Sequence, residues 1–333
     1  RVHGPDDSQN TVFEEVKPLL TSLLDGYNVC IMAYGQTGSG KTHTMIGSQL
    51  LEELTGIQQE TQQGIIPKAA AELFRLIDEK PADSHSVEVS VMEVHNNEVF
   101  DLLAADGGGQ RRDVITTSSG ASQVTALVHE PVCGAAEVMR IIDRVLTLRA
   151  RCPTMIHADS SRSHLIVTLT ISSKSPNAAA LGETHTHTHT HTHTPDNPNL
   201  SPSSPQAADC QKGHAALHQK AVVETKLQLV DLAGSECVGM SGVSGAALWE
   251  VSCINRSLSA LSDVLGALAE QRPHVPYRNS KLTHLLQDAI GGDAKLLLML
   301  CVSPTQRFVA ESLQSLGLGT RARQVQKELP RQK

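Results

Sequence analysis

The chain has 333 residues, a formal net charge of −7 from 28 basic and 35 acidic side chains, and only 2% aromatic residues. This length suits one large domain or two ordinary ones, and the composition excludes collagen, a coiled-coil rod and a wholly disordered chain. The acidic balance argues against a general nucleic-acid binder, and the longest late apolar stretch, residues 296–302, is too short to span a bilayer.

Strand and helix patterns alternate through most of the chain. Compact or alternating apolar runs predict strands at residues 28–34, 87–95, 165–171, 226–232 and 295–302. Apolar residues at helical spacing predict helices at residues 68–78, 135–150, 252–270, 281–290 and 311–327. We therefore expect an α/β fold with a central, mostly parallel mixed sheet that is covered by helices on both faces.

Residues 173–220 do not fit this alternation. They hold five of the 15 Pro and seven of the 16 His, and they carry no net charge. Such a segment buries too little surface to offset its ordering entropy, so we expect a disordered insertion in one domain that spans residues 1–330. Its Thr-His repeat at 184–194 could present imidazoles to a metal, but expansion of a CA dinucleotide tract explains the repeat more simply.

Seven cysteines are scattered along the chain without any C-x-x-C pair. The odd number and irregular spacing argue against a disulfide framework and a zinc finger, and they favour a reduced, cytosolic setting. The chain begins at Arg1 rather than Met, so we expect that an upstream segment has been cut away.

The segment GQTGSGKT fits the phosphate-binding pattern G-x-x-x-x-G-K-[ST] and follows a predicted strand. Its glycines let the backbone wrap a phosphate, and the helix that follows adds its positive dipole end. Lys41 is suited to bridge two phosphates, and the Thr42 hydroxyl is suited to Mg²⁺. The candidate nucleotide-binding residues are Gly35, Gln36, Thr37, Gly38, Ser39, Gly40, Lys41 and Thr42.

Two further segments are candidates to complete a hydrolytic site. Asp231 ends a buried strand, where ligands bind in open α/β sheets, and Gly234 can bring its N–H to a γ-phosphate without Cβ obstruction. The string DSSRSH at 159–164 offers two hydroxyls, a guanidinium and an imidazole to a metal and a water molecule. Taken singly, each segment has an ordinary alternative, a strand-end Asp or a polar turn.

Taken together, these motifs resemble a kinesin motor domain, which is a P-loop NTPase. The matching strings are AYGQTGSGKT at 33–42, EVHNNEVFDLL at 93–103, SSRSH at 160–164, LVDLAGSE at 229–236, INRSLSAL at 254–261 and HVPYRNSKLTHLLQD at 274–288. The resemblance covers residues 1–325 apart from the insertion. The carboxy-terminal-motor, minus-end-directed class looks closest.

The resemblance implies a microtubule-stimulated ATPase that uses ATP and Mg²⁺. The implied catalytic residues are Ser160, Ser161, Arg162, Asp231, Gly234 and Glu236. Among them, Ser161 and Asp231 approach the metal together with Thr42, and Arg162 and Glu236 form a latch that closes when ATP is bound. Phosphate contacts then order the switch loops, and the helix near Ser252 carries the change to the track.

The implied partner is the microtubule, which is acidic and calls for a basic binding face. The candidate residues are Arg256, Arg272, Arg278 and Lys281, although a solvated helix face is the ordinary alternative. The resemblance also implies a place in the cytoplasm on the cytoskeleton, at the centrosome or spindle. It allows dimerisation through regions outside this chain, and it predicts no nucleic acid partner and no membrane span.

Four features depart from the kinesin pattern. Residues 237–255 contain no Lys or Arg, His157 stands where the family has Asn, and the family's first strand is missing before Arg1. The fourth is the long insertion, which replaces a short connection between two core strands. Two hypotheses therefore stay open: a stepping, minus-end-directed motor, and a microtubule-binding regulator that does not step and has weak or absent ATPase activity. A P-loop kinase or GTPase is disfavoured, because SSRSH and LVDLAGSE would then go unexplained.

Overall fold

A computed structural model describes residues 1–48, 62–82, 84–104, 109–151, 162–174, 222–236 and 246–325. The strands are β1 (Val29–Tyr34), β2 (His85–His95), β3 (Glu98–Asp101), β4 (Gln110–Arg112), β5 (Val114–Thr116), β6 (Ser122–Val124), β7 (Glu130–Val132), β8 (His164–Ser173), β9 (Val223–Asp231) and β10 (Lys295–Leu300). The α-helices are α1 (Gln9–Phe13), α2 (Lys17–Leu24), α3 (Lys41–Met45), α5 (Ile65–Asp78), α6 (Ala135–Arg151), α9 (Ala246–Ala269), α10 (Lys281–Leu285), α11 (Gln287–Gly291) and α12 (Val309–Gln324). Short 3₁₀ turns are η4 (Tyr277–Asn279) and η5 (Gln306–Phe308).

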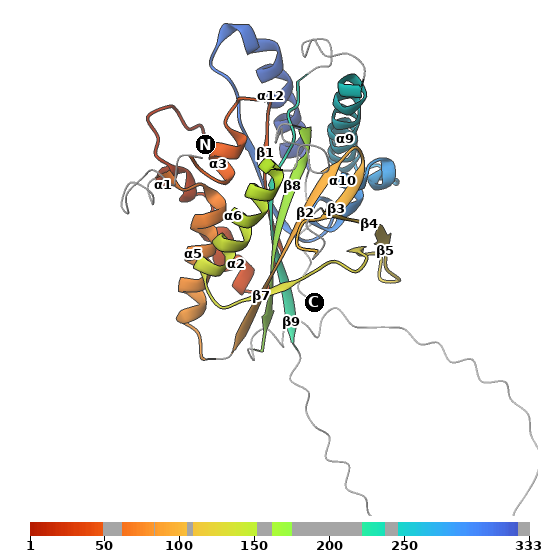
Figure 1. The fold of residues 1–333 in the computed structure, drawn as a ribbon. Coiled ribbons are helices and arrows are strands. Elements are labelled where there is room, and N and C mark those ends of the chain that lie inside the picture. The colour runs from red at the N-terminus through yellow and green to blue at the C-terminus, as the bar shows by residue number, and fades with distance from the viewer. Residues whose placement is uncertain are drawn as a thin grey trace, which may run out of the picture.

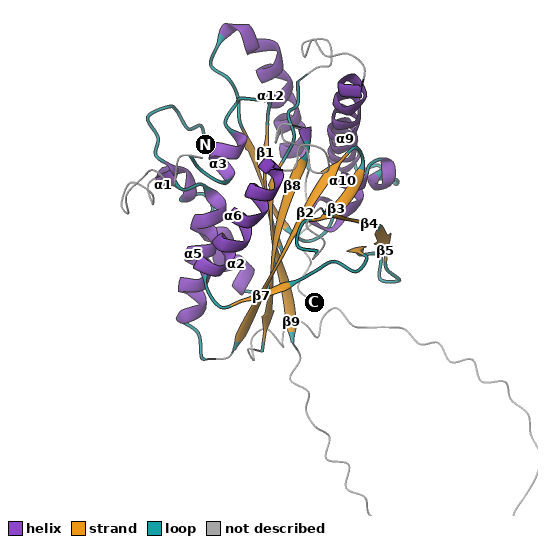
Figure 2. Cartoon of the chain, in the orientation of Figure 1, coloured by secondary structure: helices purple, strands orange, loops and turns teal. Residues whose placement is uncertain are grey.

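The central sheet runs in the order β10-β1-β9-β8-β2-β3-β4, with β7 pairing β2 beside it (Figure 2). Within the described residues, β10, β1 and β9 are parallel, and the other pairs of this sheet are antiparallel. The expected mixed sheet is confirmed, but parallel pairing is restricted to these three strands. The reason is that successive strands pair directly: β2 turns into β3 at Asn96 and Asn97, both with positive φ, as a two-residue hairpin requires.

Helices cover both faces of the sheet, as the sequence predicts. Figure 1 shows α2, α5 and α6 on one side and α9, α10 and α12 on the other. Alternate residues of β1 serve the two cores: Val29 and Ile31 pack on the α2–α5–α6 side, whereas Cys30 and Met32 pack on the α9–α10 side. Both faces of the central strands are therefore buried, which leaves the strand ends as the natural place for functional groups.

The predicted helix at 281–290 is the one element that the structure divides. It forms α10 and α11, which are separated at Leu286, where the backbone adopts φ −92° and ψ 10°. The Leu286 side chain is fully buried at this point, so the chain breaks its helical path while it keeps its apolar contact. Helix α9 begins at Ala246, six residues before the predicted start at residue 252.

β8 and β9 are neighbours in the sheet, and their far ends meet where Ser173 pairs with Val223. Residues 175–221, which include the Thr-His repeat, connect these strands and lie outside the described residues. The sequence-based expectation of an insertion there stays a prediction.

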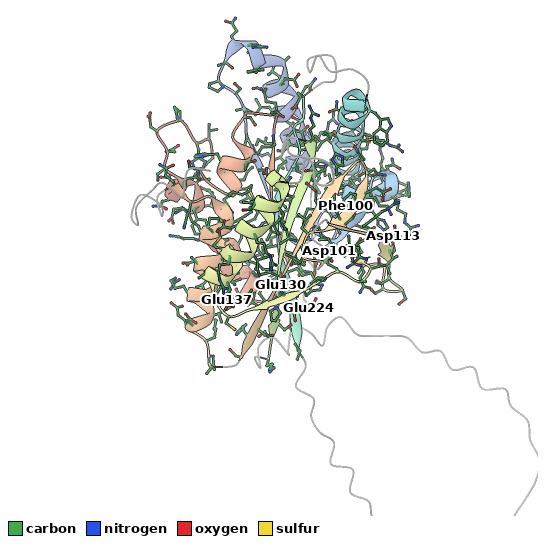
Figure 3. The ribbon with its side chains drawn as sticks, viewed as in Figure 1. Phe100, Asp101, Asp113, Glu130, Glu137 and Glu224 are labelled. Atoms are coloured by element: carbon green, nitrogen blue, oxygen red, sulfur yellow. The ribbon has the colours of Figure 1, made fainter. Side chains whose placement is uncertain are left out.

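Asp101 holds the strands beyond β2 together, and Figure 3 labels it at that side of the sheet. Its side chain is fully buried, and its two oxygens accept hydrogen bonds from the backbone N–H groups of Leu103 and Val128 and from the Arg112 guanidinium. A buried carboxylate with this many hydrogen-bond donors stabilises the fold at this point.

None of the helices in the described parts of the chain is long and apolar enough to cross a bilayer.

Candidate functional site

The strand directions bring the candidate residues to one edge of the sheet. β1, β9 and β10 are parallel, so the P-loop after β1, Asp231 at the end of β9 and Cys301 after β10 meet at the same edge. β8 runs the opposite way and therefore begins there, with His164 at its first position and Leu165 paired with Asp231. Segments far apart in the sequence thus converge on one place.

The P-loop depends on glycine at three positions. Gly35, Gly38 and Gly40 have φ values of 156°, 76° and 98°. A Cβ on Gly35 would also collide with the carbonyl oxygen of Cys301, whereas no atom lies within 4 Å of a Cβ built on Gly38 or Gly40. Gly38 and Gly40 therefore require glycine for their left-handed backbone, whereas Gly35 requires it because a side chain there would also collide with Cys301.

Lys41 and Thr42 open α3 and point into this edge. The Lys41 ammonium donates to the Gln36 carbonyl oxygen at 2.9 Å, and the Thr42 hydroxyl donates to Asp231 Oδ2 at 2.7 Å. Burial lowers the pKa of Lys41 and raises the pKa of Asp231, since each charge is removed from water. The structure thus brings together three of the residues that the sequence predicted to act on a nucleotide and its metal.

Several buried polar atoms at this edge have no hydrogen-bond partner among the described residues: Gln36 Oε1, Asp231 Oδ1 and Ser235 Oγ. Buried polar atoms are nearly always paired in folded proteins, so several unpaired polar atoms in one place indicate a site that binds a polar ligand. The Asp231 carboxylate and the Thr42 hydroxyl are hard oxygen donors of the kind that Mg²⁺ prefers. The donor set therefore fits a nucleotide with its metal ion.

Glu236 contacts the P-loop directly. Its two carboxylate oxygens accept hydrogen bonds from the Thr37 N–H at 2.8 Å and from the Thr37 hydroxyl at 2.7 Å. Gly234 lies beneath this contact, because a Cβ there would collide with both Glu236 and Thr37. Sequence reasoning paired Glu236 with Arg162 and did not find its contact with Thr37, since no local pattern joins positions 199 residues apart.

A buried ion pair supports the start of β8. Glu93 Oε1 accepts hydrogen bonds from Arg149 Nε at 3.0 Å and from the Ser163 hydroxyl at 2.5 Å, and Arg149 Nη2 donates to Ser163 Oγ at 2.7 Å. All three residues are buried. The residue after Arg162 is thereby fixed to β2 and α6, and the Arg162 carbonyl lies 3.3 Å from His95 Nδ1.

His164 is a second residue whose role the sequence did not reveal. Its Nδ1 accepts the Ala233 N–H at 3.0 Å, and its Nε2 lies 2.7 Å from the Ser257 hydroxyl oxygen. The available signal was a histidine immediately before a buried strand, next to the serines and arginine of SSRSH. It lies between the segment after β9 and helix α9.

Some predicted residues lie outside the described residues: Ser160, Ser161, His157, residues 237–245 and the Thr-His repeat. Within the described ranges, no group of three or more His, Cys, Asp or Glu side chains is placed to hold a metal ion by itself. Roles for Ser160 and Ser161 therefore stay predictions.

The four basic residues predicted to contact a track differ in their surroundings. Arg272 pairs with Glu270 at 2.6 Å, and Lys281 pairs with Asp113 at 3.3 Å. Arg278 is exposed and donates to the Thr116 hydroxyl at 3.2 Å, and Arg256 is exposed on α9. The β5–β6 hairpin therefore lies beside Arg278 and Lys281, which the sequence alone did not indicate.

A separate hollow lies between β7 and α6, with a volume of about 390 Å³. Its charged residues neutralise one another, since Arg144 pairs with Glu130 and Arg140 pairs with Glu137. Figure 3 labels both glutamates there. Unlike the P-loop edge, this hollow is lined by no buried polar atom that lacks a hydrogen-bond partner among the described residues.

A comparison with known protein families identifies the family of this chain. Residues 1–325 match the kinesin motor domain family. The chain is a member of that family. The resemblance seen in the sequence is thereby confirmed, and with it the class of microtubule-stimulated P-loop ATPases.

Individual kinesins are similar over nearly the whole chain. Kinesin-like protein KIF25 of Macaca fascicularis is 52% identical over 341 residues, which cover 98% of this chain and 57% of that protein. KIF25 of Homo sapiens is 51% identical, with 100% of this chain and 89% of that protein covered. Kinesin-like protein KIN-14E of Oryza sativa subsp. japonica is 37% identical over 98% of this chain and 26% of its own length.

A solved structure of a fast kinesin has the same architecture. It superposes with a TM-score of 0.77 at 32% sequence identity and covers 100% of this chain and 82% of that chain. The expected kinesin-type fold, a mixed sheet with helices on both faces, is therefore confirmed. A kinesin motor domain binds nucleotide and associates with the microtubule cytoskeleton, so these coarser expectations are confirmed as well.

Proposed function

We propose that this kinesin motor domain hydrolyses ATP with Mg²⁺ and uses the cycle to move along microtubules. The observation that supports this most directly is the 2.7 Å hydrogen bond between the Thr42 hydroxyl and Asp231, beside the buried Lys41. This bond brings two oxygen ligands of the kind that Mg²⁺ prefers together at the start of α3, next to the ammonium group of Lys41. When bound, Mg²⁺–ATP supplies the phosphoanhydride bond to be cleaved.

The residues of the chain have separate tasks in this proposal. Lys41 leaves the Gln36 carbonyl and neutralises phosphate oxygens, and the N–H groups at the start of α3 cradle them. Asp231 would help to hold the metal ion, and Gly234 would place its N–H against the terminal phosphate. Ser160 and Ser161 would supply hydroxyls to the metal ion and to the water that attacks the phosphate.

The proposed latch requires Glu236 to change partners. Here its carboxylate is held by Thr37 of the P-loop. In the proposed cycle it turns to the Arg162 guanidinium, which is suited to a bidentate carboxylate contact. The contact with Thr37 then represents the open latch.

Removal of either latch residue tests this assignment. Glu236→Ala and Arg162→Ala should keep nucleotide affinity near the wild-type value and should lower microtubule-stimulated turnover at least about 100-fold, as loss of a group that acts in the transition state does. Binding of a fluorescent ATP analogue and steady-state turnover are the two measurements. Glu137→Ala on the exposed face of α6 is the control. Equal losses of binding and turnover would show that these residues hold the nucleotide rather than the latch.

A second candidate function is a microtubule-binding regulator that does not step. It is favoured by the outward face of α9, where the described exposed side chains are Trp249, Ser252, Arg256, Ser259 and Asp263, so that the charges cancel. A weak steering field on this face would slow the encounter with an acidic track. Steady-state ATPase with and without microtubules separates the candidates: retained nucleotide binding without stimulation identifies the regulator.

The finer parts of the proposal need their own measurements. We infer minus-end-directed movement, a place at the centrosome or spindle in the cytoplasm, and dimerisation through other regions of the protein. Gliding of polarity-marked microtubules measures direction, imaging of a tagged full-length protein measures location, and sedimentation of that protein measures its oligomeric state. Residues 1–330 act as one motor domain, and the insertion expected at 173–220 begins only after Ser173, which is the last residue of β8.

A further inference from the structure

His164 is buried where three parts of the fold meet. It is the first residue of β8, and only 2% of its surface is exposed. One ring nitrogen contacts the backbone of Ala233, directly before Gly234, and the other contacts Ser257 in α9. A single side chain thus bridges the segment next to the proposed phosphate sensor and the long helix α9.

The hydrogen bonds of this bridge have a fixed direction. A backbone N–H can only donate, so His164 Nδ1 is the acceptor for Ala233 and the ring proton lies on Nε2. Nε2–H therefore donates to the Ser257 hydroxyl oxygen, and that hydroxyl donates to the Ile254 carbonyl oxygen at 2.7 Å. The chain of bonds runs from Ala233 through His164 and Ser257 into the backbone of α9.

The surroundings keep the imidazole neutral. Burial, reinforced by electrostatic interactions with Lys41, His95 and Arg149, lowers the pKa of His164 to about 3. A protonated ring would offer two donors and would lose the bond from Ala233. The bridge is therefore intact throughout the ordinary pH range.

We propose that His164 is a positioning residue that couples the main chain at Ala233 and Gly234 to helix α9. This inference rests on the proposed function, in which Gly234 meets the terminal phosphate. When Gly234 approaches a phosphate, the Ala233 N–H moves with it. Water cannot replace a lost bond at this depth, so the ring follows Ala233 and Ser257 follows the ring.

Two substitutions at His164 separate the two bonds. In His164→Asn the amide oxygen occupies the place of Nδ1 and keeps the acceptor for Ala233, but it cannot reach Ser257. In His164→Gln the terminal amide reaches Ser257 but leaves Ala233 without its acceptor. Ser257→Ala removes the same bond as His164→Asn from the other side and tests the bridge with an intact histidine. Thr168→Val is the matched control, since Thr168 is buried on the same strand and its hydroxyl has no hydrogen-bond partner among the described residues.

Hydrogen exchange of α9 is the primary measurement, with the purified motor domain in ADP and in a non-hydrolysable ATP analogue. We expect the wild type and Thr168→Val to change amide exchange in α9 between the two nucleotides. His164→Asn and Ser257→Ala should bind both nucleotides with wild-type affinity and should lose this difference. The ratio of microtubule affinities between the two nucleotide states should shrink about tenfold in both variants, the effect of one buried hydrogen bond.

The outcomes distinguish this inference from the proposed function. A nucleotide response of α9 that the wild type shows and both variants lose, without any microtubule-stimulated turnover, contradicts the proposed function and supports the bridge. A response in His164→Asn and Ser257→Ala equal to that of the wild type overturns the bridge, and so does an equal loss in Thr168→Val. If His164→Asn fails to fold, Ser257→Ala together with the control decides the question.

Discussion

Gly35 shows how one residue is restricted at the phosphate-binding edge. Its φ of 156° is combined with close approach to the Cys301 backbone, which belongs to the segment after β10. Gly40 has a left-handed backbone with φ 98°, but no atom lies within 4 Å of a Cβ built there. A side chain at Gly40 would therefore cause backbone strain alone, whereas a side chain at Gly35 would also cause a steric collision.

Alanine at these positions should have unequal costs. Gly40→Ala should lower the free energy of unfolding by about 1 kcal/mol through left-handed strain alone. Gly35→Ala should lower it by about 2 kcal/mol more, because its Cβ forces β1 and the segment after β10 apart. Denaturant unfolding without nucleotide measures both variants. Equal losses would mean that the collision with Cys301 is relieved without cost.

At the scale of the elements, the Glu93–Arg149–Ser163 cluster ties β2, α6 and β8 together beneath the Arg162 segment. Arg149 and Glu93 are 6% and 2% exposed, so neither charge has water as an alternative partner. Helix α6 also carries an exposed pair of the same chemistry, Arg140 and Glu137. Helix α6 thus contributes one arginine to a buried ion pair and another to an exposed ion pair, so the stabilities of the two pairs can be compared.

Removal of the arginine from each pair should differ strongly in its effect. Arg149→Leu should lower the free energy of unfolding by about 3–5 kcal/mol, because the Glu93 charge is left buried and unpaired. Arg140→Leu should change it by less than about 1 kcal/mol, as is usual for exposed pairs. The double variant Glu93→Leu/Arg149→Leu should recover part of the first loss. Urea unfolding curves test these values, and additive losses in the double variant would contradict the buried ion-pair interpretation.

The connection between β8 and β9 has a separate consequence. Since Ser173 pairs with Val223, a short turn can join the strands in place of residues 175–221. Such a deletion should preserve the fold and raise the stability by about 0.6 kcal/mol for each halving of the loop length. Thermal unfolding and basal ATPase measure the outcome. A deletion variant that does not fold would contradict the proposed insertion and indicate that this segment contributes to the core.

At the scale of the whole molecule, the net charge of −7 says little about the acidic track, because placement decides. The predicted basic residues follow one another along α9, the turn after it, η4 and the start of α10, and the last two contact Thr116 and Asp113 at the β5–β6 hairpin. The pairs with Glu270 and Asp113 already neutralise Arg272 and Lys281. Arg256 and Arg278 have no ion-pair partner among the described residues, and Asp263 on the same face of α9 offsets the charge of Arg256 from a distance.

Substitution of these arginines should follow that division. Arg256→Ala and Arg278→Ala should each weaken microtubule affinity up to about fivefold at low salt, since an exposed charge contact contributes up to about 1 kcal/mol. The effect should shrink as ionic strength rises. Arg272→Ala is the matched control and should change affinity little. Co-sedimentation with microtubules at two salt concentrations measures all three, and a dominant effect of Arg272 would contradict this division.

The sequence by itself determined the features that depend only on neighbouring residues along the chain. The P-loop is a contiguous pattern after an apolar strand, and the alternation of strands and helices predicts a covered sheet. Helix and strand cores were predicted well because their apolar periodicity is local. The break at Leu286 was missed, since the apolar spacing continues through it.

Only the tertiary structure decided which of these residues meet. Thr42 and Asp231 are 189 residues apart, and Thr37 and Glu236 are 199 residues apart, so no spacing rule predicts their contacts. The direction of β8 places His164 at the phosphate edge, between Ala233 and Ser257. The physical reason is that motifs specify chemistry through neighbouring residues, whereas strand pairing and burial choose partners across the whole chain.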